Sequence, residues 1–597
     1  MLRRRVISGL CLTLMCLLCV TGLIVASGAD TRVADAAMNG EKETVRSLIK
    51  QAADVNSAHG DGMTALHWAA LNGDAEMAQL LVYAGGNLKA ATRLGAFTPL
   101  YMAAKTGSAP VIDVLLKAGA NPKAASSSGL TPLHMAATSG DAQSVRLLAE
   151  KGADVNALET ERGQTPLAYA ASFNRPEAIK VLLQFGANVN LASKVVAPMP
   201  AQRGEGGGNG QIPAVPAAGQ PPAQAQGRGG RGAGQEPAAA GQAAQQQQQN
   251  NNNGMDAGSR GGGNPKGALT ALMYAARQGS MEATLALVEG GANLNALNGD
   301  KSTALLLAII NGNFDIAKYL VERGANVNLA SMDGATPLYV VANTQWARKS
   351  FHPQPSTKYE KTSYLELFNV LLDKGADPNV RLTKELWYSE YNFSLESATA
   401  AGTTAFWKCA EVGDIDGMRL LVSRGADPKI GSTEGVTPLL MAAGAGVHGN
   451  DDVSAPVGRL AAVKYLVEEL HLDVNAADTG GNARINGNVQ QAAATPQPQQ
   501  PGTLAPAAGQ PQPQQQQQAP GRNSGGFTAL HSAAARGDNE MILYLVSRGA
   551  KVDAVSKNGV TVVDMANGPR QRIQPYPETV ALLELLGAKN SHKCISC

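Results

Sequence analysis

The chain has 597 residues, which is too long for one hydrophobic core and predicts either several domains or growth by repetition. Aromatic residues make up only 4% of it and there are 66 glycines, a balance that favours short helices joined by tight turns. The formal net charge of +2 is too small to indicate nucleic acid or a generally acidic partner for the chain as a whole.

Residues 1–29 have the pattern of a secretory signal peptide. Three arginines at positions 3–5 precede an apolar run over 10–25, and small residues follow as far as Ala29. The pattern predicts cleavage near Ala29 and export to the periplasm or the cell exterior. An uncleaved segment would instead anchor the protein in a membrane, because the run is long for a signal peptide and short for a span. A membrane contact is expected only in that case.

A repeated string organises the rest of the chain. TPLYMAAKTGS at Thr98 recurs as TPLHMAATSGD at Thr131, and the two starts are 33 residues apart. Further copies begin at Thr64, Thr165, Thr270, Thr303, Thr336, Thr437 and Thr528. A second string, KGADVNA, starts at Lys151, 20 residues after Thr131, and has its own copies along the chain. Both strings and the spacing resemble those of the ankyrin-repeat family over nearly the whole chain after residue 29, outside the linkers.

The residues of one copy explain the recurrence. Thr131 is placed to cap a helix whose first turn holds Pro132, and Leu133 begins a narrow apolar stripe along that helix. Gly140 ends the first helix and Gly152 ends a second one, after which a finger-like loop leads to the next threonine. One unit cannot bury its own apolar face, so neighbouring units must stack. The chain is therefore predicted to be an all-α ankyrin-repeat solenoid of about twelve helix-turn-helix units with finger loops.

Two tracts rich in Gly, Pro, Gln and Asn divide the repeats and are predicted to be disordered linkers. We expect the repeats to stack continuously across the first tract, because it leaves and re-enters the array at a finger loop. In chain order the predicted parts are the signal peptide 1–29, N-terminal repeats 30–195, the first linker 196–267, repeats with insertions 268–481, the second linker 482–526, C-terminal repeats with a cap 527–590, and a tail 591–597.

No pattern of an active site stands out. The chain contains no GxSxG, HExxH or GxxxxGK[ST] string, and the GRGGRG string at Gly227 lies in low-complexity sequence. The histidines at the fourth position of their strings are His67, His134 and His531. The family resemblance implies that they bond to a neighbouring loop, so we expect no metal site. We also expect no enzymatic activity and no nucleic-acid partner.

The resemblance implies a protein partner, bound through the concave face and the finger loops. Positions two and one residues before the glycine of each first helix vary as a recognition surface would. These predicted partner-binding residues are Leu71, Asn72, Lys105, Thr106, Thr138, Ser139, Arg277 and Gln278. The finger tips vary likewise, at Arg93, Glu161, Arg162, Asp300, Lys301 and Asp333. The predicted function is that of a protein–protein interaction scaffold whose partner the sequence does not name.

The tail HKCISC holds a Cys-x-x-Cys pair at Cys594 and Cys597. In an exported protein this pair resembles the start of a c-type haem attachment site, in which a histidine follows the second cysteine. No histidine follows here, and His592 lies before the pair. Two interpretations stay open. The pair forms a disulfide or two free thiols without a cofactor, or the gene product continues with His and the repeats are the docking arm of a redox protein with haem c.

Overall fold

The computed structural model describes residues 30–197, 264–347, 355, 357–384, 386, 400–445, 458–480, 525–567 and 575–591. The chain divides into two compact units. Unit 1 comprises Met1–Val196, Lys266–Gly299 and Thr303–Ala308, and unit 2 comprises Ala197–Pro265, Asp300–Ser302 and Ile309–Cys597. Within the described ranges the α-helices fall into twelve successive pairs, one per repeat, which confirms the predicted all-α solenoid. No helix in these ranges is both long and apolar enough to cross a membrane.

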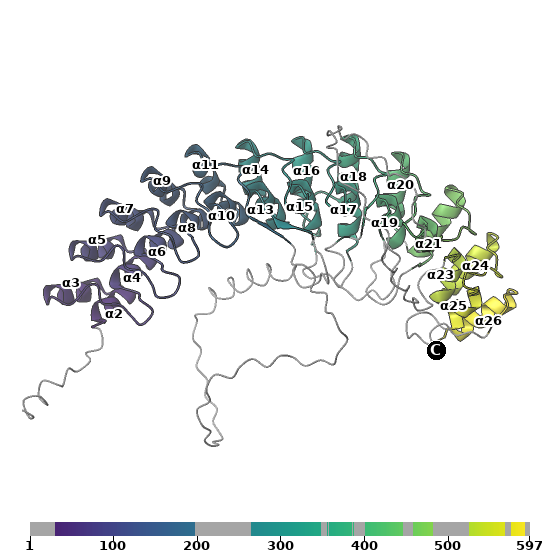
Figure 1. Ribbon diagram of the computed structural model, residues 1–597, viewed down its shortest axis with the longest axis horizontal. Helices are drawn as coiled ribbons and strands as arrows, with labels where there is room; N and C mark the ends of the chain where they lie inside the picture. Colours follow the sequence, from purple (N-terminus) through teal and green to yellow (C-terminus); the bar gives the residue numbers. More distant parts are fainter. Residues whose placement is uncertain are drawn as a thin grey trace, which may run out of the picture. The chain divides into compact units, whose positions relative to one another are not determined.

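In unit 1 the helices form two rows (Figure 1). The first helices of the repeats are α2 (Arg32–Met38), α4 (Ala65–Leu71), α6 (Pro99–Thr106), α8 (Pro132–Ser139), α10 (Pro166–Ser172) and α13 (Ala271–Gln278). The second helices are α3 (Lys42–Lys50), α5 (Ala75–Tyr83), α7 (Ala109–Lys117), α9 (Ala142–Glu150), α11 (Pro176–Gln184) and α14 (Met281–Glu289). Each first helix packs on the next first helix and on the second helix of its own repeat. Helix α15 (Ala304–Ile310) crosses the division between the units.

The repeat at Thr131 shows why the helices begin and end where they do. Thr131 has an extended backbone and forms a capping box with His134, while Pro132 occupies the first turn, where its missing N–H costs no hydrogen bond. Gly140 ends the helix with a φ of +86°, a left-handed conformation that favours glycine. Leu133 is fully buried between the neighbouring repeats. These local signals are those that the sequence predicts.

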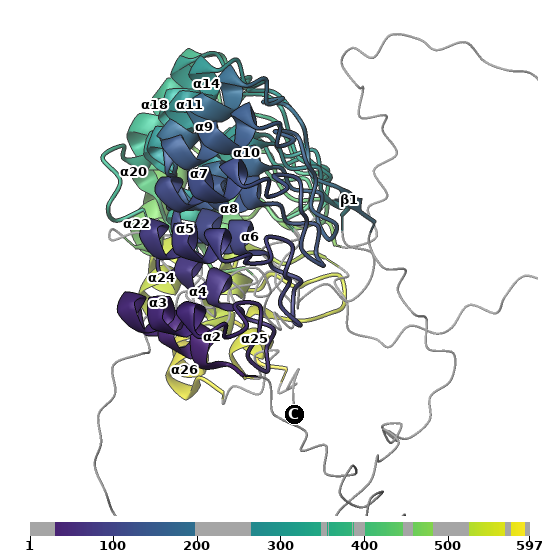
Figure 2. The same cartoon turned by 90° about the vertical axis from the view of Figure 1, so that its left-hand side faces the viewer.

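Finger loops join successive repeats and pair with one another through their backbones. In the finger before Thr131, Ser126 Oγ accepts a hydrogen bond from Leu130 N at 3.0 Å and closes the base of the loop. Thr160 N of the next finger donates to Ser128 O at 2.9 Å. Figure 2 shows the fingers of unit 1 projecting from one side of the helices. The loops are therefore held at fixed positions beside the first helices.

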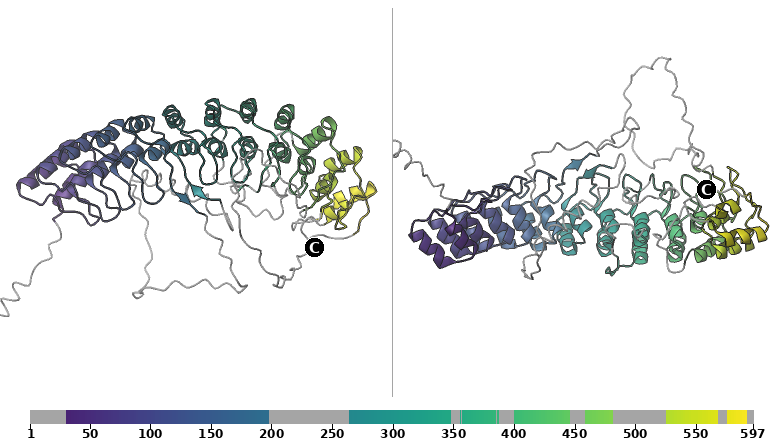
Figure 3. Two further views of the ribbon diagram at one scale, coloured as in Figure 1. Left: turned by 45° about the horizontal axis from the view of Figure 1, so that its top comes forward. Right: turned by 90° about the horizontal axis from the view of Figure 1, so that it is seen from below.

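The first insertion leaves unit 1 at a finger without disturbing the base of that loop. Ser193 N donates to Leu269 O at 3.0 Å, and Leu269 N donates to Ser193 Oγ at 2.9 Å. Beyond this closure β1 (Val195–Val196) pairs antiparallel with β2 (Lys266–Gly267), the arrows of Figure 3. The predicted linker 196–267 is thus ordered at its two ends, at 196–197 and 264–267, where the strand pair forms. Residues 198–263 lie outside the described ranges, so their predicted disorder stays a prediction.

The repeats on either side of the first insertion stack on each other. Helix α10 packs against α13 as other neighbouring first helices do. Asn190 Oδ1 accepts a hydrogen bond from Asn293 N at 2.8 Å, and Gln164 Nε2 donates to Tyr274 OH at 2.7 Å. The predicted continuous stacking across the linker is confirmed within unit 1.

Unit 2 continues the same pairing of helices. Its helices are α16 (Phe314–Glu322), α17 (Pro337–Gln345), α18 (Tyr364–Asp373), α19 (Ala405–Val412), α20 (Ile415–Ser423), α21 (Pro438–Ala442), α22 (Arg459–Lys464), the π-helix η1 (Tyr465–Glu469), α23 (Ala529–Ala535), α24 (Asn539–Ser547), α25 (Val562–Asn567) and α26 (Pro577–Leu585). The second insertion also leaves at a closed finger, where Phe527 N donates to Asp478 Oδ1 at 2.8 Å. Asn475 Oδ1 accepts from Lys551 N at 2.9 Å and couples the repeats on its two sides.

Candidate functional site

One face of unit 1 combines the predicted contact positions. It is made by helices α4, α6, α8, α10 and α13 and by the finger loops at 57–63, 90–97, 124–130, 157–164 and 191–197 with 266–269, and we call it the first-helix face. The five helices contain no Asp or Glu, and Lys105 and Arg277 are their basic residues. The five helices of the face therefore carry a formal charge of +2 in a short stretch of sequence, equal to the net charge of the whole chain.

Two of the predicted residues are open to a partner. Lys105 and Gln278 are exposed, and neither side chain has a hydrogen bond or an ion pair within the described ranges. Both lie near the ends of their helices, α6 and α13. Leu71 is half-buried at the end of α4 and contributes an apolar edge to the same face. Lys105 and Gln278 thus lie on packed helices, and their side chains form no polar contact that stabilises those helices.

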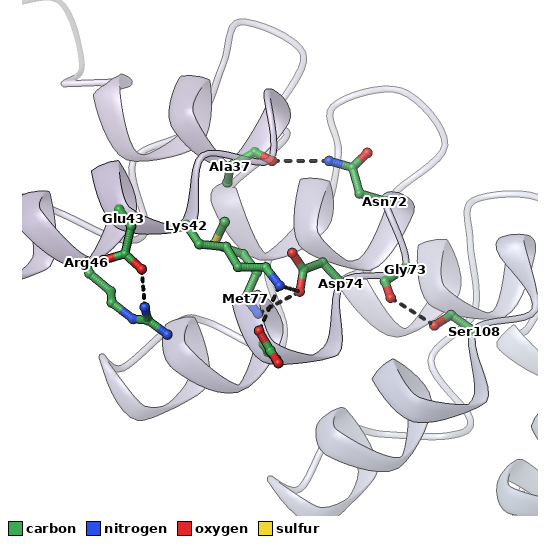
Figure 4. Close-up of polar contacts among 10 residues, drawn as sticks. Ala37, Lys42, Glu43, Arg46, Asn72, Gly73, Asp74, Met77 and Ser108 are labelled. Carbon is green, nitrogen blue, oxygen red and sulfur yellow. Dashed lines mark hydrogen bonds and ion pairs between the residues drawn. The ribbon is translucent and has the colours of Figure 1, made fainter.

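Four other predicted residues bond to helix ends. Asn72 Nδ2 donates to Ala37 O at 3.2 Å and couples the second repeat to the first (Figure 4). The remaining three hydroxyls bond to carbonyls of their own helices: Thr106 Oγ1 to Ala103 O, Thr138 Oγ1 to His134 O, and Ser139 Oγ to Ala136 O. A partner contact at these positions stays a prediction, but their side chains already serve the fold. The sequence pattern did not reveal this second role.

Arg277 differs from the expectation of an exposed side chain. It is half-buried, and its guanidinium lies 5.3 Å from the centre of the Tyr274 ring. Burial lowers the pKa of Arg277, and the charge of Arg162 lowers it further. Tyr274 lies three residues earlier on the same helix, a spacing that places the two side chains on one face.

A cluster of tyrosine and arginine forms around this contact. It comprises Arg162, Gln164, Tyr169, Tyr274 and Arg277, and we call it the tyrosine–arginine cluster. Burial raises the pKa of the half-buried Tyr169, and the charges of Glu159 and Arg162 also act on it. Arg162 is exposed on the finger, and its side chain has no ion pair within the described ranges. The cluster thus brings together residues from a finger loop, α10 and α13, separated by up to 115 positions in the sequence.

Comparison with known families decides the class of the protein. A family model for ankyrin repeats in three copies matches residues 33–126, 100–193 and 242–345, and a single ankyrin-repeat model matches residues 525–557. The chain is an ankyrin-repeat protein. No curated protein matches it in sequence. Ankyrin repeats generally mediate protein–protein interactions and are typically non-enzymatic, so the class indicates binding of another protein.

The histidines of the ankyrin strings are structural, as the resemblance implied. Thr131 N donates to His134 Nδ1 at 3.1 Å, and His134 Nε2 lies 3.2 Å from Gln164 O of the next finger. Burial lowers the pKa of His134 to about 4. Within the described ranges no three residues of the His, Cys, Asp and Glu types are grouped to hold a metal ion. Cys594 and Cys597 lie outside those ranges, so the structure does not bear on a haem site.

Two finger-tip residues of unit 2 are buried, against expectation. Asp300 and Asp333 have exposed fractions of 6% and 1%. The Asp333 carboxylate lies 3.0 Å from Lys384 Nζ and accepts a hydrogen bond from Asn264 Nδ2, also at 3.0 Å. Asn264 lies near the end of the predicted first linker and Lys384 lies in a later insertion, so these partners come from 69 and 51 positions away. In this ankyrin array, insertions cover part of the finger surface.

Proposed function

We propose that the protein is an interaction scaffold that binds another protein through the first-helix face of unit 1. The observation that carries the proposal concerns Lys105, Gln278 and Arg162. Their side chains form no hydrogen bond or ion pair within the described ranges, while their backbones belong to packed helices and a closed finger loop. A binding surface gains affinity when the backbone that presents its side chains is ordered before the partner arrives. The family contributes the class of partner, because ankyrin repeats generally bind proteins.

The second-helix row supports the choice of face. Several charged side chains there pair with each other, as Lys117 does with Asp113 at 2.6 Å and Lys180 with Glu177 at 2.7 Å. Such pairs present little net charge to an approaching protein. By contrast, Lys105 and Arg162 keep their full charge toward solvent and would steer an encounter to the first-helix face.

Cross-linking followed by affinity capture tests the proposal. The full chain, exported by its native host, is captured and its partners are identified by mass spectrometry. We expect the Lys105→Glu, Gln278→Glu double variant to lose a partner that the unmodified chain captures. Lys50→Glu is the matched control, because Lys50 is also exposed and also lies in the last turn of its helix. Equal capture by both variants would overturn the choice of face.

The export signal decides where the partner is sought. Residues 1–29 predict the periplasm or the cell exterior, so capture is performed on that fraction. A partner recovered only from the cytoplasm would contradict the proposed localisation but not the proposed binding face.

A further inference from the structure

We infer that the partner binds the first-helix face with an acidic, extended segment, whose carboxylates pair with Arg162, Arg277 and Lys105. The inference rests on the proposed function and adds to it the chemistry of the partner. It is carried by the distribution of charge, by the tyrosine–arginine cluster and by the spacing of the repeats.

Basic residues outnumber acidic ones on this face. Its helices and finger loops contain six basic residues, Arg93, Lys105, Arg162, Lys194, Lys266 and Arg277, and three acidic ones, Asp61, Glu159 and Glu161. Glu159 is buried, and its carboxylate accepts hydrogen bonds from the backbone N–H groups of Glu161, Arg162 and Gln164. The carboxylate is therefore engaged in closing the finger, although its charge still acts on Tyr169. The exposed acidic residues of the face are therefore Asp61 and Glu161, whereas five of its six basic residues are exposed.

The tyrosine–arginine cluster strengthens a carboxylate contact. Arg277 is half-buried over Tyr274, and Arg162 is near enough for the two charges to repel. A carboxylate placed between two arginines relieves that repulsion, and a partly desolvated site makes each charge-assisted hydrogen bond stronger than one at an exposed lysine. An acidic side chain is the group in proteins that meets both conditions.

Tyr169 adds a further group to the same place. Its ring packs edge-on against His134, with centroids 5.4 Å apart, and its hydroxyl has no hydrogen bond within the described ranges. A half-buried tyrosine offers an apolar ring and an O–H donor together. The hydroxyl can donate to a carboxylate of the bound segment while the ring contacts an apolar side chain next to it.

The spacing of the repeats favours an extended segment. Packed helices lie about 8–10 Å apart, and an extended chain advances about 3.3–3.6 Å per residue. A segment that crosses the row from α6 to α13 therefore meets a new first helix about every third residue. Carboxylates repeated at that interval would reach Lys105 at one end of the row and the tyrosine–arginine cluster at the other.

Nucleic acid fits this surface less well. Lys105 and Arg277 lie on α6 and α13, and the two first helices between them, α8 and α10, carry no lysine or arginine. Binding to a phosphate backbone relies on neutralising several successive phosphates. The few basic side chains of this face are separated by tyrosines, so they suit a protein segment whose carboxylates are separated by apolar residues.

The test uses a defined probe and the full chain. A fluorescein-labelled peptide of four Glu-Leu-Ser units is compared with a Gln-Leu-Ser peptide of equal length by fluorescence anisotropy. We expect the Glu peptide to bind at least about tenfold tighter than the Gln peptide, and to bind more weakly as salt is raised. Arg162→Glu and Lys105→Glu should each weaken the Glu peptide about tenfold, whereas Lys50→Glu should leave it unchanged.

Three results would overturn the inference. Equal affinity for the two peptides would show that the carboxylates do not contribute to binding. Unchanged affinity of the Arg162→Glu variant for the Glu peptide would show that the tyrosine–arginine cluster does not bind it. If a twelve-nucleotide oligothymidine bound as tightly as the Glu peptide or more tightly, the first-helix face would be a nucleic-acid-binding surface. The proposed function fails separately, because it depends on capture of the native partner. If Lys105→Glu, Gln278→Glu loses that partner while no Glu peptide binds, only the acidic segment is refuted.

Discussion

Acid should destabilise the repeat at Thr131 because its histidine is buried in the neutral form. His134 has no exposed surface, its Nδ1 accepts from Thr131 N, and its Nε2 faces Gln164 O. A second proton on the ring would remove the acceptor at Nδ1. The pKa of His134 is accordingly lowered from 6.5 to about 4. Protonation therefore opposes the folded state.

The sign and the size of the effect follow from that pKa. The unfolded chain takes up the proton near pH 6.5, so stability is fully present above that value and is lost as the pH falls toward 4. A difference of about 2.5 in pKa corresponds to about 3 kcal/mol, of which about 2.5 kcal/mol should be lost by pH 4.5. His531 in unit 2 also has its pKa lowered by burial to about 4, and it should act in the same direction.

The variant His134→Gln separates the acid-induced loss of stability that is due to His134 from the loss that is due to the other histidines. Glutamine at the third helical position can still complete the capping box but does not titrate. Urea unfolding of both proteins at pH 7.5 and pH 4.5 should show an acid loss smaller by about 2.5 kcal/mol in the variant. An imidazole resonance of His134 that titrates above pH 6, or the same acid loss in both proteins, would refute the reasoning.

Three further outcomes are expected. Replacing residues 197–265 by Asn-Gly should join β1 to β2 in a two-residue hairpin. The shorter loop should add about 3 kcal/mol to the free energy of unfolding, and the lost hydrogen bonds of Asn264 should subtract about 1 kcal/mol. The urea midpoint should therefore rise, and a lower midpoint would contradict the stacking of the repeats across the linker. Leu133→Ala should destabilise by about 2–5 kcal/mol, whereas Lys105→Glu should stay within about 0.5, both measured by circular dichroism during unfolding. Asn190→Ala should cost about 1 kcal/mol and speed hydrogen exchange at the Asn293 amide, and unchanged exchange would show that this bond does not couple the repeats.

The sequence by itself determined the repeat and its packing. The threonine cap at Thr131, the fully buried Leu133 and the left-handed Gly140 all lie where the string predicts them. The cap and the glycine end depend on residues within one or two turns of helix, so a local pattern is enough to identify them. The burial of Leu133 depends on the neighbouring repeats and could be predicted because the string recurs. Most of these signals recur in the next copies, although the copy at Thr165 ends its first helix at Phe173 and not at glycine. Obligatory stacking follows because a single unit cannot cover its own apolar face. The same logic predicted that the array continues past its first insertion.

The tertiary structure decided which variable residues are free. Arg277 and Asp333 vary as surface residues do, yet one lies over Tyr274 and the other is buried against Lys384. Asn72 is exposed, but its amide bonds to the preceding repeat. The exposure of a side chain depends on the segments that pack beside it. In this chain the insertions place residues from many positions away in the sequence beside the repeats. No pattern within a single repeat contains that information, so the cluster that joins Arg162, Tyr169 and Arg277 exists only once the repeats have stacked.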